Sequence, residues 1–95
     1  MDADLVHIIP RLQGLPATLP VEGAIRIELQ EGIPILRASA SVQDRVEDLA
    51  SKRRESRLSR EEAEEFDRYE EIDDYLSLLN RLVRNLFQAR KQGEN

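Results

Sequence analysis

The stretch IRIELQEGIPIL, residues 25–36, contains the clearest β pattern in the sequence, and the fold class follows from it. Apolar and charged residues alternate over residues 25–29, with the period of two that is typical of a half-buried strand. Gln-Glu-Gly at residues 30–32 predicts a three-residue hairpin loop, in which Gly32 takes a positive φ. Residues 33–36 form the return strand. Pro34 has no backbone N–H, so its amide side is expected to face an edge of the ribbon.

After the ribbon, the spacing of apolar residues changes from two to three and four. Val42, Val46 and Leu49 recur at i, i+4 and i+7 with charged residues between them. This spacing is typical of an amphipathic helix. Ser41 is a plausible N-cap for it, and we expect the helix to end near Glu55.

A second and longer helix is predicted from Ser59 to about Gln92, since this range contains no Gly and no Pro. Ser59 and Glu62 match the capping-box pattern at its start, and Gly93 is a stop signal at its end. A helix of about 33 residues is about 50 Å long, too long for so small a protein to surround by itself. Its apolar residues form a heptad-like seam, which we expect to be the interface of a homodimer: Tyr69, Ile72, Leu76, Leu79, Val83 and Leu86.

The predicted fold is therefore mostly α with a short β-hairpin (α+β), in which the hairpin precedes a helical hairpin with a long, dimerising second helix. We divide the chain into an N-terminal segment (1–21), one domain (22–92) and a tail (93–95). The N-terminal segment is rich in proline but also apolar, so it is either a flexible tail or a segment that orders against a partner or a second subunit. We expect partner binding by this segment and the ribbon, through Leu5, Ile8, Ile9, Ile25, Ile27, Leu29, Ile33 and Ile35.

The composition excludes several classes of protein. The 95 residues include no Cys, which excludes disulfides and thiolate metal sites. The longest apolar runs are far shorter than the roughly 18 residues of a membrane span. The first residues lack the basic region of a signal peptide. We expect a cytoplasmic protein with no membrane contact.

Charge is distributed in blocks, although the net charge is only −5. Residues 61–75 contain nine acids and one base, and this block is interpreted as a solvated face, as a surface for a basic partner or, least favoured, as a metal site. The sequence before this block, residues 52–57, is rich in Lys and Arg. These cations are explained either by the preference of helix C-termini for positive charge or by phosphate binding. The candidate phosphate contacts are Lys52, Arg53, Arg54 and Arg57.

No catalytic motif is present. The sequence has no G-x-S-x-G elbow, no phosphate-binding loop and no G-x-G-x-x-G, and its only histidine, His7, has no evident partner. We therefore expect neither an enzyme nor a cofactor or metal.

Two functions remain: a protein-binding module and a small DNA-binding dimer. The order of one strand and two helices imitates ribbon-helix-helix proteins, with residues 33–38 as the strand. That match is poor, because Pro34 would interrupt strand pairing between subunits and only Arg37 would be a polar reader.

The stretches IRIELQEGIPILRAS, VQDRVEDL and LSREEAEEFDRYEEIDDYLSLLNRLVRN resemble small acidic bacterial antitoxins of two-gene toxin–antitoxin systems. The resemblance covers about residues 22–87 and depends on a general pattern, not on a catalytic signature. It implies a homodimer that neutralises a toxin, often a nuclease in such systems, by direct protein contact. The chain has no evident N-terminal DNA-binding domain of the kind that many antitoxins carry.

Overall fold

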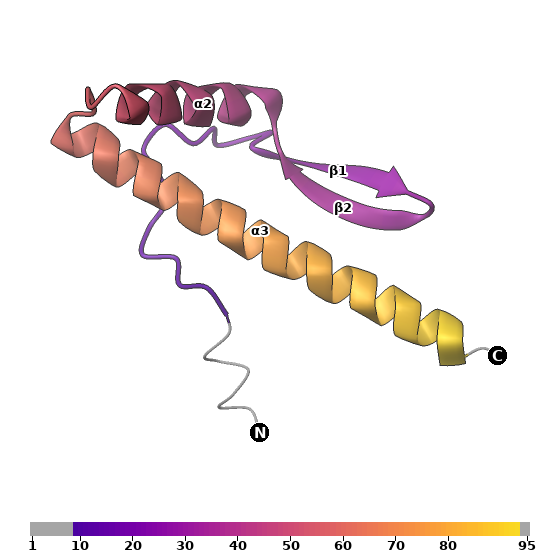
Figure 1. The fold of residues 1–95 in the computed structure, drawn as a ribbon. Helices are drawn as coiled ribbons and strands as arrows, with labels where there is room; N and C mark the ends of the chain where they lie inside the picture. Colours follow the sequence, from indigo (N-terminus) through magenta and orange to yellow (C-terminus); the bar gives the residue numbers. More distant parts are fainter. Residues whose placement is uncertain (1–8, 94–95) are drawn as a thin grey trace.

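The fold is a β-hairpin followed by two helices (Figure 1). The computed structural model describes the backbone of residues 9–93 and the side chains of residues 9–90. Strands β1 (Ile25–Gln30) and β2 (Ile33–Ala38) pair antiparallel, and helices α2 (Ala40–Arg54) and α3 (Arg60–Gly93) follow. This order confirms the predicted α+β class.

The hairpin loop has two residues, so the predicted three-residue loop is wrong. Gln30 pairs with Ile33 as the last rung of the ladder, which leaves only Glu31 and Gly32 between the strands. Their φ angles are both positive, at 54° and 83°. A two-residue loop with this backbone has the twist of the flanking strands, which is the reason such turns are favoured in hairpins.

The helix starts agree with the sequence in one case and differ in the other. Ser39, not Ser41, is the N-cap of α2: its Oγ accepts a hydrogen bond from the Val42 N–H at 3.4 Å. The capping box of α3 is confirmed, since the Glu62 N–H donates to Ser59 Oγ at 3.1 Å and the Ser59 N–H donates to Glu62 Oε1 at 3.1 Å. The hydrogen bonds to Ser39 Oγ and Ser59 Oγ satisfy the N–H groups of Val42 and Glu62, which have no partner inside their helices.

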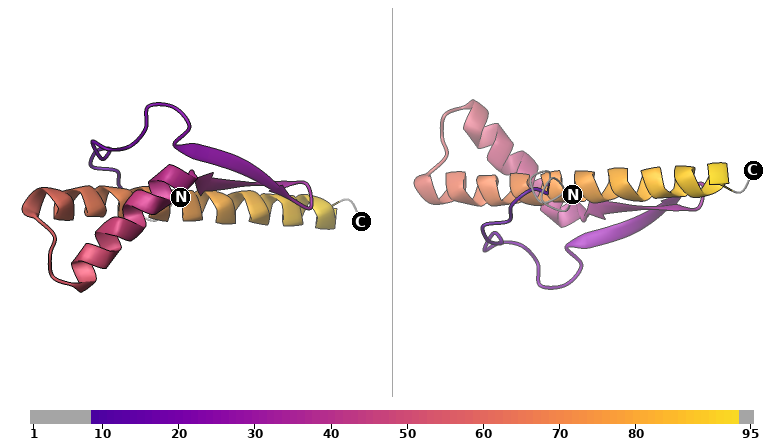
Figure 2. Two further views of the ribbon diagram at one scale, coloured as in Figure 1. Left: turned by 90° about the horizontal axis from the view of Figure 1, so that it is seen from above. Right: turned by 90° about the horizontal axis from the view of Figure 1, so that it is seen from below.

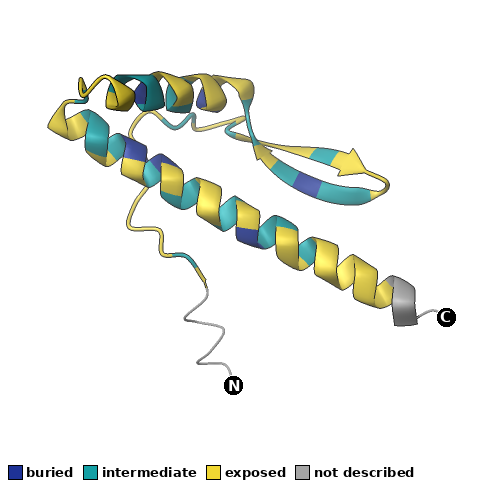
Figure 3. Cartoon of the chain, viewed as in Figure 1, coloured by how far each residue is buried: buried dark blue, intermediate teal, exposed yellow. Residues whose placement is uncertain are grey.

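The core lies where α2 crosses the N-terminal half of α3 at an oblique angle (Figure 2). Four buried side chains form it: Val42, Leu49, Phe66 and Tyr69. Half-buried apolar residues from the N-terminal segment, the hairpin and both helices pack around them. Residues 81–90 of α3 are largely exposed (Figure 3).

The molecule is elongated, with extents of 55 × 32 × 25 Å and a radius of gyration of 16.3 Å. A compact domain of this length has a radius of gyration of about 12 Å. The difference arises because α3 runs past the core and continues beside the hairpin, where β2 packs against it.

The described part of the N-terminal segment packs on its own chain. The Gln13 N–H donates to Glu71 Oε1 at 3.0 Å, and the Thr18 hydroxyl bonds to the Tyr69 hydroxyl at 2.7 Å and to the Glu65 carboxylate. Gln13 and Thr18 thus attach this part of the segment to α3 of the same chain.

Candidate functional site

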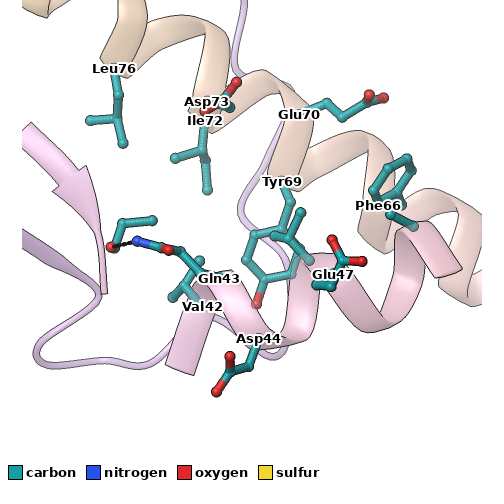
Figure 4. Close-up of a pocket in the computed structure, with 13 residues that line it drawn as sticks. Val42, Gln43, Asp44, Glu47, Phe66, Tyr69, Glu70, Ile72, Asp73 and Leu76 are labelled. Atoms are coloured by element: carbon teal, nitrogen blue, oxygen red, sulfur yellow. Dashed lines mark hydrogen bonds between the residues drawn. The ribbon is translucent and has the colours of Figure 1, made fainter. Parts of the chain in front are cut away.

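A groove of about 520 Å³ lies between α2 and α3 (Figure 4). Its apolar lining comes from one face of each helix, because Val42, Val46 and Ala50 repeat every four residues on α2 and Ile72 and Leu76 do so on α3. These five side chains are only partly covered, except Val42, which is buried. The groove can therefore accept further apolar side chains.

Carboxylates surround this apolar lining. Four acids line the groove: Asp44 and Glu47 from α2, and Glu70 and Asp73 from α3. Glu47 is paired with Arg54 at 3.3 Å, and Glu70 is 4.0 Å from Arg53. Asp44 and Asp73 are exposed and make no ion pair with the described residues. These four carboxylates form the rim of the groove, and the rim favours a cationic ligand. The sequence showed the acidic block of α3 but not its position beside a groove.

Two ion pairs fasten α2 to the start of α3 beside the groove. Arg45 holds Glu65 through two hydrogen bonds of 2.8 Å each, and Lys52 holds Glu62 at 2.7 Å. The hydrogen bonds to Arg45 lower the pKa of the Glu65 carboxyl and raise the pKa of Arg45. The Lys52 hydrogen bond, with that of the Ser59 N–H, lowers the pKa of Glu62 to about 2. Both ion pairs therefore favour the charged forms of Glu62 and Glu65.

The basic run is matched by carboxylates. Each of the four candidate phosphate contacts has an acidic partner: Lys52 with Glu62, Arg53 with Glu70, Arg54 with Glu47, and Arg57 with Glu55. Arg53 also lies over the Phe66 ring, with its guanidinium carbon 5.5 Å from the ring centre. Phosphate binding remains a prediction, but these cations already have anionic neighbours.

The hairpin residues predicted to bind a partner are divided between its two faces. Ile25, Ile27 and Leu29 are exposed on the face that they share with Pro34 and Leu36 of β2. The opposite face carries Ile33, which is half-buried, and Ile35, which is 5% exposed. Of these five hairpin residues, only Ile25, Ile27 and Leu29 are exposed for contact with a partner. Ile9 is also exposed, whereas Leu5 and Ile8 lie outside the described residues.

The predicted dimer seam is also divided along α3. Tyr69 belongs to the chain's own core and Ile72 packs against it. Leu76 lines the groove and also a second apolar hollow under the N-terminal segment. Further along, Leu79 and Val83 are half-buried and Leu86 is 69% exposed. An intermolecular seam would therefore be restricted to the C-terminal half of α3, and dimerisation remains a prediction.

Within the described range 9–93, no group of three or more His, Asp or Glu side chains is arranged to hold a metal ion. None of the helices in that range is both long and apolar enough to cross a membrane. Comparison of the chain with protein-family models, with curated proteins and with solved structures gave no match.

Proposed function

We propose that this chain is a protein-binding module, and that its α2–α3 groove takes a basic amphipathic segment of another protein. The observation that carries the proposal is the position of Asp44 and Asp73, two carboxylates without a described ion pair, on either side of an apolar lining. Apolar side chains of the ligand would fill the groove, and its Lys or Arg residues would meet the rim.

The resemblance to antitoxins supports a toxin as the partner. A nuclease toxin needs a cationic surface to bind the phosphates of its substrate. An acidic groove that covered such a surface would exclude the substrate electrostatically and sterically. Neutralisation of a nuclease by direct contact is therefore the form of the function that we propose.

We do not extend the proposal to DNA binding. In the ribbon-helix-helix alternative, residues 33–38 would pair with the same strand of a second subunit. In this chain β1 takes one edge of that strand, and the Asn80 side chain of α3 bonds to its other edge at Leu36. The basic side chains that would contact phosphate are paired with acids.

The test begins with the reading frame that neighbours this gene. We expect its product to arrest growth when expressed alone and to be harmless when this chain is co-expressed. The double variant Asp44→Lys/Asp73→Lys should lose this protection and should weaken binding of the purified partner. Asp67→Lys/Asp74→Lys is the matched control, because it makes the same charge change at exposed acids outside the groove. Equal protection by the two double variants would contradict the groove as the binding site.

A further inference from the structure

The two outer edges of the hairpin differ sharply. On the β2 edge, the Leu36 N–H donates to Asn80 Oδ1 at 2.8 Å and the Leu36 carbonyl accepts from Asn80 Nδ2 at 2.9 Å. Pro34, on the same edge, has no N–H to offer. The β2 edge is therefore closed, whereas β1 lies on the side of the ribbon away from α3 (Figure 2).

The backbone groups that β1 presents at its outer edge follow from the phase of the ladder. The Ser39 N–H bonds to the Ala24 carbonyl at 2.8 Å, so even-numbered residues of this strand face β2. The outward bonds of Leu36, which is opposite Ile27, confirm that phase independently. Alternation along an antiparallel ladder then turns the N–H and C=O groups of Ile25, Ile27 and Leu29 outward.

We propose that a second copy of this chain pairs on that edge, β1 against β1, antiparallel and centred on Ile27. Ile27 then lies opposite Ile27 of the second copy, and Ile25 lies opposite Leu29. All three are residues whose backbone groups face outward, so the new ladder can form every hydrogen bond with the existing backbone. The result is a four-stranded sheet with the strand order β2-β1-β1-β2.

Charge selects this register. Within one chain Arg26 lies directly opposite Arg37. Glu28, two residues further along β1, pairs with both, at 3.0 Å from Arg26 and 2.6 Å from Arg37. In the proposed pairing, Arg26 meets Glu28 of the second copy, and the reverse contact forms by symmetry. Shifting the centre to residue 26 or 28 would place Arg against Arg or Glu against Glu, which is unfavourable between directly opposite residues.

The apolar face gives the same pairing a second source of stability. Ile27 and Leu29 are 67% and 71% exposed in the single chain. A two-fold axis perpendicular to the sheet puts Ile25, Ile27 and Leu29 of both copies on one face as a continuous row. Because six-residue edges bury little area, we expect a dimer whose population depends on concentration. No residue of β1 lines the α2–α3 groove, so the pairing is argued independently of the proposed function.

Two complementary charge reversals test the register. Arg26→Glu puts two Glu residues opposite each other at both contacts, and Glu28→Arg does the same with Arg. Each variant alone should dimerise about tenfold more weakly than the unaltered chain. An equimolar mixture should recover the affinity, since both contacts in the heterodimer join Arg to Glu. Sedimentation equilibrium would measure the mass against the 10.9 kDa of one chain.

A third variant keeps the test decisive if the charge-reversal variants fail to fold. Ile27→Pro removes an outward N–H and no ladder bond, as Pro34 already does in β2, so circular dichroism should be retained while dimerisation is lost. Leu86→Glu tests the competing α3 seam and should leave the dimer intact. The proposal is overturned if the unaltered chain is monomeric even at the concentration of an NMR sample. It is equally overturned if Leu86→Glu dissociates the dimer while Arg26→Glu and Ile27→Pro do not.

Discussion

Asn80 on α3 bonds to both backbone groups of Leu36 on β2, 44 positions away in the sequence, as a neighbouring strand would. Its Oδ1 accepts from the N–H at 2.8 Å and its Nδ2 donates to the carbonyl at 2.9 Å. This pair of bonds attaches the hairpin to the helix outside the α2–α3 core cluster, next in sequence to the buried Ile35 and close to Leu78 on α3. It also occupies the β2 edge of the ribbon at Leu36.

Asn80→Ala should therefore destabilise the protein although it removes no core side chain. Both groups of Leu36 would lose their partners in a partly buried position, so we expect the free energy of unfolding to fall by about 1–3 kcal/mol. Urea unfolding followed by circular dichroism measures the change. Asn85→Ala, at an exposed position of the same helix, is the control and should change it by less than about 0.5 kcal/mol. Equal effects of the two substitutions would show that the Asn80 bonds contribute little.

The turn of the hairpin offers a stabilising substitution. Glu31 has a φ of 54°, in the left-handed region that Asn and Gly adopt more readily than Glu. An Asn-Gly pair is preferred in two-residue loops of this kind, so Glu31→Asn should raise the free energy of unfolding by about 0.5 kcal/mol. Gly32→Ala, at a φ of 83°, should lower it by about 1 kcal/mol. Thermal unfolding checks both, and a lower melting temperature for Glu31→Asn would contradict the argument.

The turn and the Asn80 bonds explain why the elements were easier to predict from the sequence than their details. The strands and helices could be predicted because the regular spacing of apolar residues is visible within each segment of the sequence. The length of the loop could not be predicted, since a two-residue and a three-residue loop can both end at Gly32. The identity of Glu31 also gives no indication that this residue has a positive φ. Asn80 was missed for a different reason: in the sequence it is one polar residue in a leucine-rich helix, and its partner is distant.

The candidate site was predictable only in part. The acidic block was visible, and a basic partner was one of its interpretations. The groove could not be predicted from the sequence, because it depends on the way α2 crosses α3. This crossing brings Asp44 to the same groove as the acids of α3. The apolar residues of the ribbon were treated as one surface, although the pairing register places Ile33 and Ile35 on the opposite face from Ile25, Ile27 and Leu29.

The core and the projecting part of α3 should respond differently to truncation. Leu49 is fully buried, so Leu49→Ala should lower the free energy of unfolding by about 2–5 kcal/mol through lost burial and a cavity. Leu86 is 69% exposed in the single chain, and Leu86→Ala should cost less than about 0.5 kcal/mol. Chemical unfolding at low protein concentration compares the two variants. A large loss in Leu86→Ala that grows with protein concentration would instead indicate that α3 is buried between chains.

Acid should weaken the attachment of α2 to α3. The hydrogen bond from Lys52 holds the pKa of Glu62 at about 2, below its ordinary value of 4.5. A carboxyl whose pKa is lower in the folded state contributes stability above the unfolded value and loses it as the pH falls through the folded value. The contribution of Glu62 is therefore complete above about pH 4.5 and disappears towards about pH 2. Glu65, whose pKa is lowered by Arg45, adds a loss of the same sign.

Urea unfolding at a series of pH values between about 7 and about 2 would measure this dependence. Glu62→Gln should flatten the acid limb of the profile, because the group that takes up a proton on unfolding has been removed. Asp67→Asn is the control, since Asp67 is exposed and has no ion pair with the described residues. If both variants keep the slope of the unaltered chain, the Lys52–Glu62 pair does not link the fold to pH.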